Sequence, residues 1–451
     1  MEILLRPEQW TLDLYPNKEG NEYKLSDYII QVEQDEKIIF IHTITWAIYE
    51  MEKKEFSNIL ENDLMKLYKV VVPIDLDELE IAHSIYLKRV TPASLPTFKN
   101  INHFTVLTTT SCNARCFYCY EEGIEKNLTM DMKTAEDILQ FMIKQPTDKN
   151  TPIHITWFGG EPLLNKRVIE YITDRLYELN VPFTTSMVSN GFLLNEETAK
   201  QFDYWKIRSI QITFDGLHEE YNKIKNFIYT DVDAFLTLVN NIHNLLKYSN
   251  TRINIKFNAN NDNIFHIYDN ILYIKEEFKE YENTGKIQYE ASSLFEYVQD
   301  PDLAVEGYWE ELERIKEIAN VRIHNTIDKE LAEPTYKRKL INFQCKAYDG
   351  QTYIIMPDGK LVRCDLMKPE DIYGDIYNGV TNMDVINAWH NFDSPKLNIC
   401  KEMKCPLHPL CPKFFRCNSC GICTKQEYIE KRIQEAKNKL IRTYKYVIEN
   451  K

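Results

Sequence analysis

Long apolar runs are missing from this sequence. No stretch approaches the ~20 apolar residues that cross a bilayer, and the first residues, Met1 to Glu8, lack the charged leader, apolar core and cleavage site of a secretory signal. An excess of basic residues is also missing, because the net charge is -14 and the pI is near 5.4. Such acidity disfavours nucleic acid as a partner. We therefore predict a cytoplasmic protein that binds neither membrane nor nucleic acid.

Cysteine is absent from residues 1–111 and again from 120–344, so the eleven cysteines fall into two blocks. Without a secretion signal, clustered cysteines indicate metal or redox use rather than disulfides. The length of 451 residues predicts two to four domains, and a composition of 44% hydrophobic and 12% aromatic residues is typical of a globular protein.

The first cysteine block is a compact loop, Cys112-x3-Cys116-x2-Cys119, that follows the β-rich run Phe104 to Leu107. A loop after a strand would close three thiolates around one point. A structural zinc normally takes four protein ligands, and so does a ferredoxin cluster. Three cysteines therefore suggest a 4Fe-4S cluster whose fourth iron is open to a small molecule. The alternative is a zinc loop completed by a distant ligand.

Strands and helices are expected to alternate from about 103 to 292. This rhythm predicts a parallel sheet with right-handed crossovers, and six repeats fit an incomplete (β/α)6 barrel, an α/β fold. The expected strands are 104–109, 153–158, 183–189, 209–214, 252–258 and 286–291. The expected helices lie near 131–144, 165–179, 195–203, 232–247 and 263–281. Function then sits at the carboxyl ends of the strands.

Polar motifs stand at three of these strand ends. Gly159 and Gly160 allow close backbone approach, and Glu161 offers a carboxylate to a cationic amine. Ser189-Asn190-Gly191 ends the third strand, and an Asp215-Gly216 turn ends the fourth. Each alone is a common turn. One per strand end, in order, they indicate a ligand pocket beside the cysteine loop.

Regions of different character flank the barrel. Residues 1–98 predict a β-hairpin over 28–42, a strand at 45–51 and helices near 55–68 and 75–87, a small winged-helix-like module that ends in a linker at 91–97. Residues 295–341 read as a charged helical bridge, 342–430 as a cysteine-rich domain and 431–451 as a C-terminal helix. A hairpin over 352–362, with Asp-Gly at its turn, would bring Cys345 and Cys364 together.

The cysteine spacing, with aromatic Tyr118 directly before the third cysteine, resembles the radical S-adenosylmethionine (SAM) superfamily. The resemblance implies that the cluster's open iron chelates SAM. It also implies that Gly159, Gly160 and Glu161 hold the SAM amino group, that Ser189 and Asn190 meet its ribose and carboxylate, and that Tyr118 and Asp215 belong to the same pocket. Relatives often carry an arginine for the SAM carboxylate about ten residues after the Asp-Gly turn. Lys225 stands there instead, and it lacks the bidentate fork.

The second cysteine block resembles the SPASM extension of radical SAM enzymes that modify peptides, which carries two auxiliary 4Fe-4S clusters. The resemblance assigns Cys345, Cys364 and Cys417 to the first cluster and Cys400, Cys405 and Cys411 to the second. Cys420 and Cys423 complete the count without a settled assignment. Zinc remains the alternative for these thiolates. Asp365, next to Cys364, resembles the base that deprotonates the substrate in sulfatase maturases; the alternative is a hydrogen-bonded loop carboxylate.

The layout of residues 1–98 looks like the peptide-recognition element of such enzymes; the alternative is a structural cap on the barrel. The resemblance thus implies a peptide maturase with three 4Fe-4S clusters and SAM. It would form a thioether or carbon-carbon crosslink in a precursor peptide with a leader, with electrons from a flavodoxin- or ferredoxin-type donor. The alternatives are an anaerobic sulfatase-maturing enzyme that makes formylglycine, a radical SAM enzyme acting on a small molecule, and a non-catalytic Fe-S or zinc protein.

Overall fold

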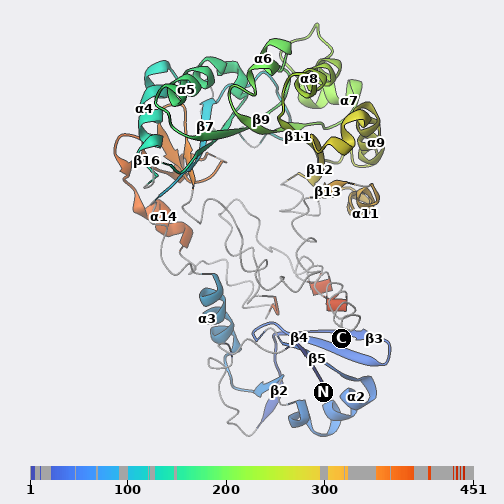
Figure 1. The fold of residues 1–451 in the computed structure, drawn as a ribbon. Coiled ribbons are helices and arrows are strands. Elements are labelled where there is room, and N and C mark those ends of the chain that lie inside the picture. Colours follow the sequence, from blue (N-terminus) through green and yellow to red (C-terminus); the bar gives the residue numbers. More distant parts are fainter. Residues whose placement is uncertain are drawn as a thin grey trace. The chain divides into compact units, whose positions relative to one another are not determined.

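The computed structural model falls into two compact units (Figure 1). One contains residues 1–94, 327–343 and 389–451, and the other contains 95–326 and 344–388. The residues that the structure describes are 2–5, 11, 22–45, 47–67, 70–90, 100–119, 121, 127–146, 150–294, 303–318, 320–323, 352–365, 367–390, 405–407, 430, 433, 434, 437, 440 and 441.

The first unit is built on a four-stranded antiparallel sheet in the order β1-β5-β4-β3. Both faces of this sheet carry buried apolar residues along β4 and β5. Phe40 and Tyr49 pack on one face against Phe56 of α2, and Ile39 and Ile41 pack on the other with Leu440. A separate two-stranded pair joins β2 and β6. The elements are β1 (Glu2–Leu5), β2 (Tyr23–Leu25), β3 (Ile29–Gln34), β4 (Lys37–His42), β5 (Ala47–Glu52), α2 (Lys53–Asn62), η1 (Leu64–Leu67), β6 (Val71–Pro73) and α3 (Glu78–Val90).

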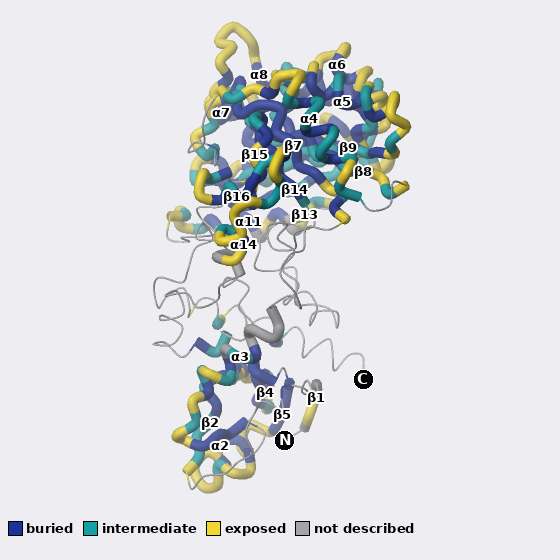
Figure 2. The backbone as a smooth tube through the Cα atoms, turned by 90° about the vertical axis from the view of Figure 1, so that its left-hand side faces the viewer, coloured by how far each residue is buried: buried dark blue, intermediate teal, exposed yellow. Residues whose placement is uncertain are grey.

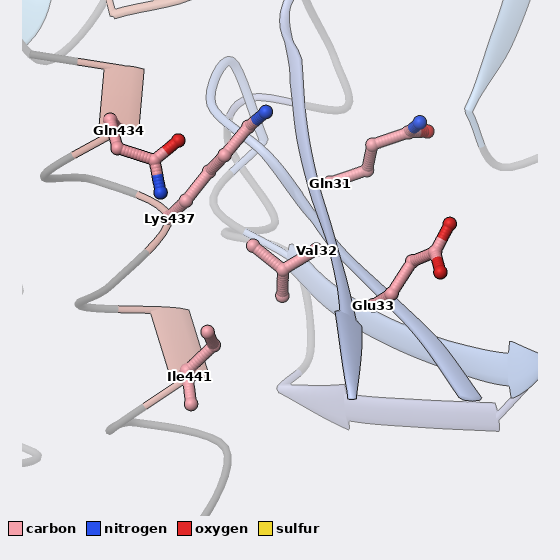
Figure 3. Close-up of a pocket in the computed structure, with 6 residues that line it drawn as sticks. All are labelled: Gln31, Val32, Glu33, Gln434, Lys437 and Ile441. Carbon is pink, nitrogen blue, oxygen red and sulfur yellow. The ribbon is translucent and has the colours of Figure 1, made fainter. Parts of the chain in front are cut away.

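A groove of about 310 Å³ lies beside β3 in this unit. Figure 3 shows Val32 of the strand turned toward the C-terminal segment, whose side chains form the opposite wall. The six lining residues are Gln31, Val32, Glu33, Gln434, Lys437 and Ile441. In the described part of the chain, β3 is an edge strand, paired on one side only.

The second unit is a parallel sheet in the order β7 to β13, with helices packed outside it (Figure 1). Figure 2 shows that the buried residues concentrate on its strands, as the apolar alternation predicts. The strands are β7 (His103–Thr109), β8 (Ile153–Gly159), β9 (Phe183–Ser189), β10 (Ile207–Thr213), β11 (Arg252–Ala259), β12 (Ile287–Ser293) and β13 (Val321–Ile323). The helices are α4 (Met132–Ile143), η2 (Pro162–Asn165), α5 (Lys166–Glu178), α6 (Glu196–Gln201), α7 (His218–Lys225), α8 (Ala234–Tyr248), α9 (Ile267–Glu277), η3 (Lys279–Thr284), α11 (Tyr308–Arg314) and η5 (Ile315–Glu317).

The predicted hairpin forms, and it extends the barrel sheet. Its first strand, β14 (Thr352–Ile355), pairs in parallel with β7 and antiparallel with β15 (Lys360–Val362). The sheet continues through β16 (Ile372–Asp375) and β17 (Gly379–Val380), with η6 (Pro369–Asp371) before them and α14 (Met383–His390) after them. The predicted cysteine-rich domain is therefore divided, since residues 344–388 belong to the barrel unit and 389–451 to the N-terminal unit.

Most element predictions are confirmed, and three need correction. The bridge over 295–341 is not wholly helical, because Val321–Ile323 pairs with β12 as a parallel strand, as suits two β-branched residues at a sheet edge. Strand β1 and the pair of β2 with β6 were not predicted. Helix α7 was not predicted; it ends at Lys225, and Asn226 directly after it takes the left-handed conformation. The linker at 91–97 lies outside the described residues.

Candidate active site

The cysteine loop begins at the carboxyl end of β7, where the barrel topology predicts function. Cys112, Cys116 and Cys119 are all half-buried. The Cys112 thiol accepts from the backbone N–H of Ala114 at 3.4 Å and from Asn190 Nδ2 at 3.8 Å. Burial raises the pKa of Cys112 to about 12, so this thiol is neutral unless a metal ionises it. Within the described residues, no three Cys, His, Asp or Glu side chains gather closely enough to form a metal site, so convergence of the thiols stays a prediction.

Gly159 and Gly160 bring the end of β8 against the cysteine loop. The backbone N–H of Gly160 donates to Thr109, and that of Glu161 donates to Ser111. A Cβ on Gly160 would stand 2.4 Å from the Ser111 carbonyl oxygen, and one on Gly159 would stand 2.2 Å from the Thr109 carbonyl oxygen. Gly159 also has φ of 129°, a conformation that side-chain-bearing residues rarely adopt. Only glycine permits this approach.

Glu161 is fully buried and links the second strand end to the third. Its carboxylate accepts from the Ser189 hydroxyl at 2.9 Å, from the Asn190 N–H at 2.8 Å and from the Leu163 N–H at 3.0 Å. Burial raises its pKa to about 7, and the three donors oppose that shift. The Ser189 hydroxyl also lies 3.1 Å from the second carboxylate oxygen. A carboxylate has about four acceptor sites, so one more donor, such as an ammonium, fits when Ser189 bonds one oxygen alone.

Asp215, Tyr118 and Lys225 meet beneath the loop. The Lys225 ammonium lies 2.6 Å from Asp215 Oδ2 and donates to Tyr118 Oη at 2.7 Å and to Thr213 Oγ1 at 2.6 Å. Tyr118 donates to the same carboxylate. Burial alone would lower the pKa of Lys225, but the Asp215 carboxylate raises it above its usual value. Burial and Asp215 raise the pKa of Tyr118, which stays protonated.

The predicted auxiliary residues are described only in part. Cys364 follows β15 in the barrel unit, its thiol 3.4 Å from Asp365 Oδ1, and Asp365 is exposed. Cys405 is buried in the N-terminal unit, where Thr43 donates to the carbonyl of Pro406. The strand register sets Val362 level with Ile354, which pairs with Thr105. The role of Asp365 as a base stays a prediction. The others lie outside the described residues: Cys345, Cys400, Cys411, Cys417, Cys420 and Cys423.

Several asparagines of the site were missed from the sequence. Asn113 is fully buried; its side-chain oxygen Oδ1 accepts from Asn190 Nδ2 at 2.7 Å, while its own Nδ2 has no hydrogen-bond partner among the described residues. Asn258 and Asn263 lie at or just after the carboxyl end of β11 and contact Asp215. The Asn258 N–H donates to Asp215 Oδ1, and Asn263 Nδ2 donates to the Asp215 backbone carbonyl. The run Asn258-Ala-Asn-Asn-Asp-Asn263 directly after the fifth strand was the available signal.

Residues 106–271 match the radical SAM superfamily, and this segment includes the cysteine loop, Glu161, Ser189 and Asp215. The chain carries a radical SAM domain. The superfamily indicates an enzyme and implies a 4Fe-4S cluster with SAM. The three-thiol loop, the orphaned amide of Asn113 and the spare acceptor site on Glu161 fit those groups.

The radical SAM domain has curated relatives. It is similar to a probable GTP 3',8-cyclase of Methanocaldococcus jannaschii, 31% identical over 37% of this chain and 52% of that protein. It is also similar to the radical SAM cyclopropyl synthase TigE of Paramaledivibacter caminithermalis, 23% identical over 48% of this chain and 50% of TigE. The chain thus spans about half the length of these relatives.

The fold is similar to that of native anSMEcpe solved with bound AdoMet and Cp18Cys peptide. The TM-score is 0.51 at 17% identity, covering 77% of this chain and 99% of that one. At this identity the likeness shows the fold alone. No helix in the described part of the chain is long and apolar enough to cross a membrane.

The Gly160→Ala variant should displace the cysteine loop, because its Cβ would fall 2.4 Å from backbone that cannot yield like a side chain. We expect a loss of at least half of the iron that Cys112, Cys116 and Cys119 are predicted to hold. Iron analysis and thermal unfolding measure this. Gly285→Ala is the control, since its Cβ meets nothing within 4 Å and its positive φ costs only about 1–2 kcal/mol. Equal iron in both variants would contradict the close approach.

Glu161 should make stability fall as pH rises. The folded-state pKa of about 7 exceeds the ordinary 4.5, so the folded chain binds the proton more tightly, and stability is lost as pH rises between these values. At about 1.4 kcal/mol per pKa unit, the loss is up to about 3 kcal/mol. Urea unfolding of the metal-free chain from pH 4.5 to 8 should show this slope in the wild type and a flatter one in Glu161→Gln. Parallel curves would refute the assignment.

Proposed function

We propose that this chain is a radical SAM enzyme that abstracts hydrogen from a ribosomally made peptide and closes a thioether or carbon-carbon crosslink. The observation that carries the proposal is the meeting of three strand ends. The cysteine loop after β7, Glu161 after β8 and the Ser189-Asn190 pair at the end of β9 are joined by hydrogen bonds at one edge of a parallel sheet.

Different residues at this edge of the sheet would hold the cluster and the parts of SAM. Cys112, Cys116 and Cys119 would hold a 4Fe-4S cluster, which, with SAM bound, supplies the electron that generates a carbon-centred radical. Glu161 would accept from the SAM ammonium at its remaining acceptor site. Asn190 already reaches Cys112 Sγ at 3.8 Å, so it can hold SAM and the cluster in one arrangement. The barrel wall excludes water from the reacting atoms.

The eight later cysteines are enough to ligate two auxiliary 4Fe-4S clusters. These clusters would accept the second electron or bind a substrate thiolate while the new bond forms. Cys364, at the end of the hairpin that extends the barrel sheet, and Cys405, buried in the N-terminal unit, are the two described members of this set. A flavodoxin- or ferredoxin-type protein would reduce the cluster at the cysteine loop.

A peptide substrate is supported by the N-terminal unit. Strand β3 is an edge strand of six residues whose pairing with β4 shows no bulge, and such edges accept a further strand. The groove beside it is lined by Val32 and Ile441, with Lys437 at its rim (Figure 3). A leader peptide would bind there in extended form. The fold neighbour that holds a peptide, anSMEcpe with Cp18Cys, is consistent with such a substrate.

A small-molecule substrate is the second candidate. The observation that favours it is the similarity of the radical SAM domain to a probable GTP 3',8-cyclase. That similarity covers 37% of this chain, and the radical SAM match at 106–271 contains neither the groove of the N-terminal unit nor the later cysteines. The features outside the domain therefore favour the peptide.

Anaerobic reconstitution and co-expression test the proposal. The chain should bind about twelve irons, four per cluster, and release 5′-deoxyadenosine only with dithionite or another reductant. Mass spectrometry of a co-expressed precursor peptide should show the loss of two hydrogens per crosslink. Absence of SAM cleavage would refute the enzyme. Formylglycine in the peptide would favour a sulfatase-maturing activity instead, and turnover of GTP without peptide would favour the small-molecule candidate.

Asp365→Asn should separate SAM cleavage from peptide modification. If Asp365 removes the substrate proton, the variant should still release 5′-deoxyadenosine but lose at least 100-fold in crosslinked peptide, within the range for a general base. Glu370→Gln, a nearby exposed carboxylate of η6, is the control and should retain both activities. Crosslinking at the wild-type rate in Asp365→Asn would leave Asp365 as a loop carboxylate.

A further inference from the structure

Lys225 stands where an arginine would be expected to meet the SAM carboxylate, yet its ammonium is already saturated. An ammonium has three donors, and the structure gives three acceptors, Asp215, Tyr118 and Thr213. The side chain is 2% exposed and that of Asp215 is 0% exposed. No donor of Lys225 is left for a ligand.

The backbone around Lys225 also holds the cysteine loop. The Arg115 N–H donates to the Lys225 carbonyl at 2.9 Å, and the Ile228 N–H donates to the Asn113 carbonyl at 2.9 Å. The segment from Lys225 to Ile228 therefore runs along the loop between Cys112 and Cys116. Helix α7 ends at Lys225, and Asn226 takes the left-handed conformation that turns the chain toward the loop.

We propose that Lys225 is a positioning residue that straps the cysteine loop to the end of β10, and that it does not contact the SAM carboxylate. Its side chain fixes Tyr118, which lies between Cys116 and Cys119, to Asp215 and Thr213 at the end of the strand. Its carbonyl fixes Arg115 on the other side of Cys116. These contacts hold the residues on both sides of Cys116. The position of Cys116 in the loop is therefore fixed before any cluster is present.

Two variants of the acceptors make a matched pair. Tyr118→Phe and Thr213→Val each remove one acceptor of Lys225, but only Tyr118 belongs to the loop. Hydrogen-deuterium exchange of the metal-free full-length chain measures how firmly the cysteine loop is held when no cofactor is bound. Tyr118→Phe should raise exchange at residues 113–119 at least tenfold, and Thr213→Val should change it less than threefold. Equal exchange in the two variants would overturn the proposal.

Variants of Lys225 separate the strap from carboxylate binding. Lys225→Met and Lys225→Arg should both raise exchange in the loop and lower the iron held there, because a planar guanidinium does not match three acceptors placed around an ammonium. Lys223→Met, an exposed lysine on the same helix, is the control and should change neither. If Lys225 instead bound the carboxylate, Lys225→Met would keep its iron and lose affinity for SAM but not for decarboxylated SAM, and Lys225→Arg would restore it.

The inference rests on the proposed function only for the identity of the cluster. A wild-type chain that binds no iron would refute the function, yet the exchange measurements would still decide whether Lys225 holds the loop. Normal iron with unchanged exchange in Lys225→Met would refute the strap and leave the function standing. With a cluster bound, its reduction potential and electron paramagnetic resonance spectrum should shift in Tyr118→Phe and not in Thr213→Val.

Discussion

The candidate site depends on the closeness of two backbones. The end of β8 runs so near the start of the cysteine loop that neither Gly159 nor Gly160 has room for a Cβ. Hydrogen bonds from Gly160 and Glu161 to the loop make use of that closeness. Because Glu161 is thereby fixed, its carboxylate can accept hydrogen bonds from the next strand end. The order of strands in the parallel sheet therefore sets the order of the polar groups in the site.

Burial determines the electrostatic character of this site. The Glu161 carboxylate, the Cys112 thiol and the pair of Asp215 with Lys225 all lie away from solvent, but they are compensated differently. Asp215 and Lys225 neutralise each other within the protein. Burial raises the pKa of Glu161 toward neutrality, and its hydrogen-bond donors oppose that rise. The uncompensated negative charge lies where a cationic ligand is proposed to bind, and the compensated pair lies beneath it as support.

The sequence predicted the strands of the parallel sheet well because their signals are local. Apolar alternation located six strands within two residues at either end, and glycine and polar residues marked their ends. It could not show that Lys225 is saturated, since that depends on Tyr118, Asp215 and Thr213 converging from different segments. Nor could it show that the later cysteine region is divided between two units, because Cys364 follows a hairpin paired with β7 while Cys405 packs in the N-terminal unit. Contacts between residues that are far apart in the chain leave little signal in the local sequence pattern.

The pairing of β7 with β14 also bears on how the chain is made. His103 lies opposite Thr352, so the strand that leads into the cysteine loop has one edge without its partner until about 250 more residues have been synthesised. At roughly 5–20 residues per second, that interval is on the order of 10–50 s. During translation the parallel sheet must therefore persist with an open edge beside its first strand. The hairpin that pairs with this strand also carries the chain to Cys364, so that edge is covered at about the time when Cys364 emerges.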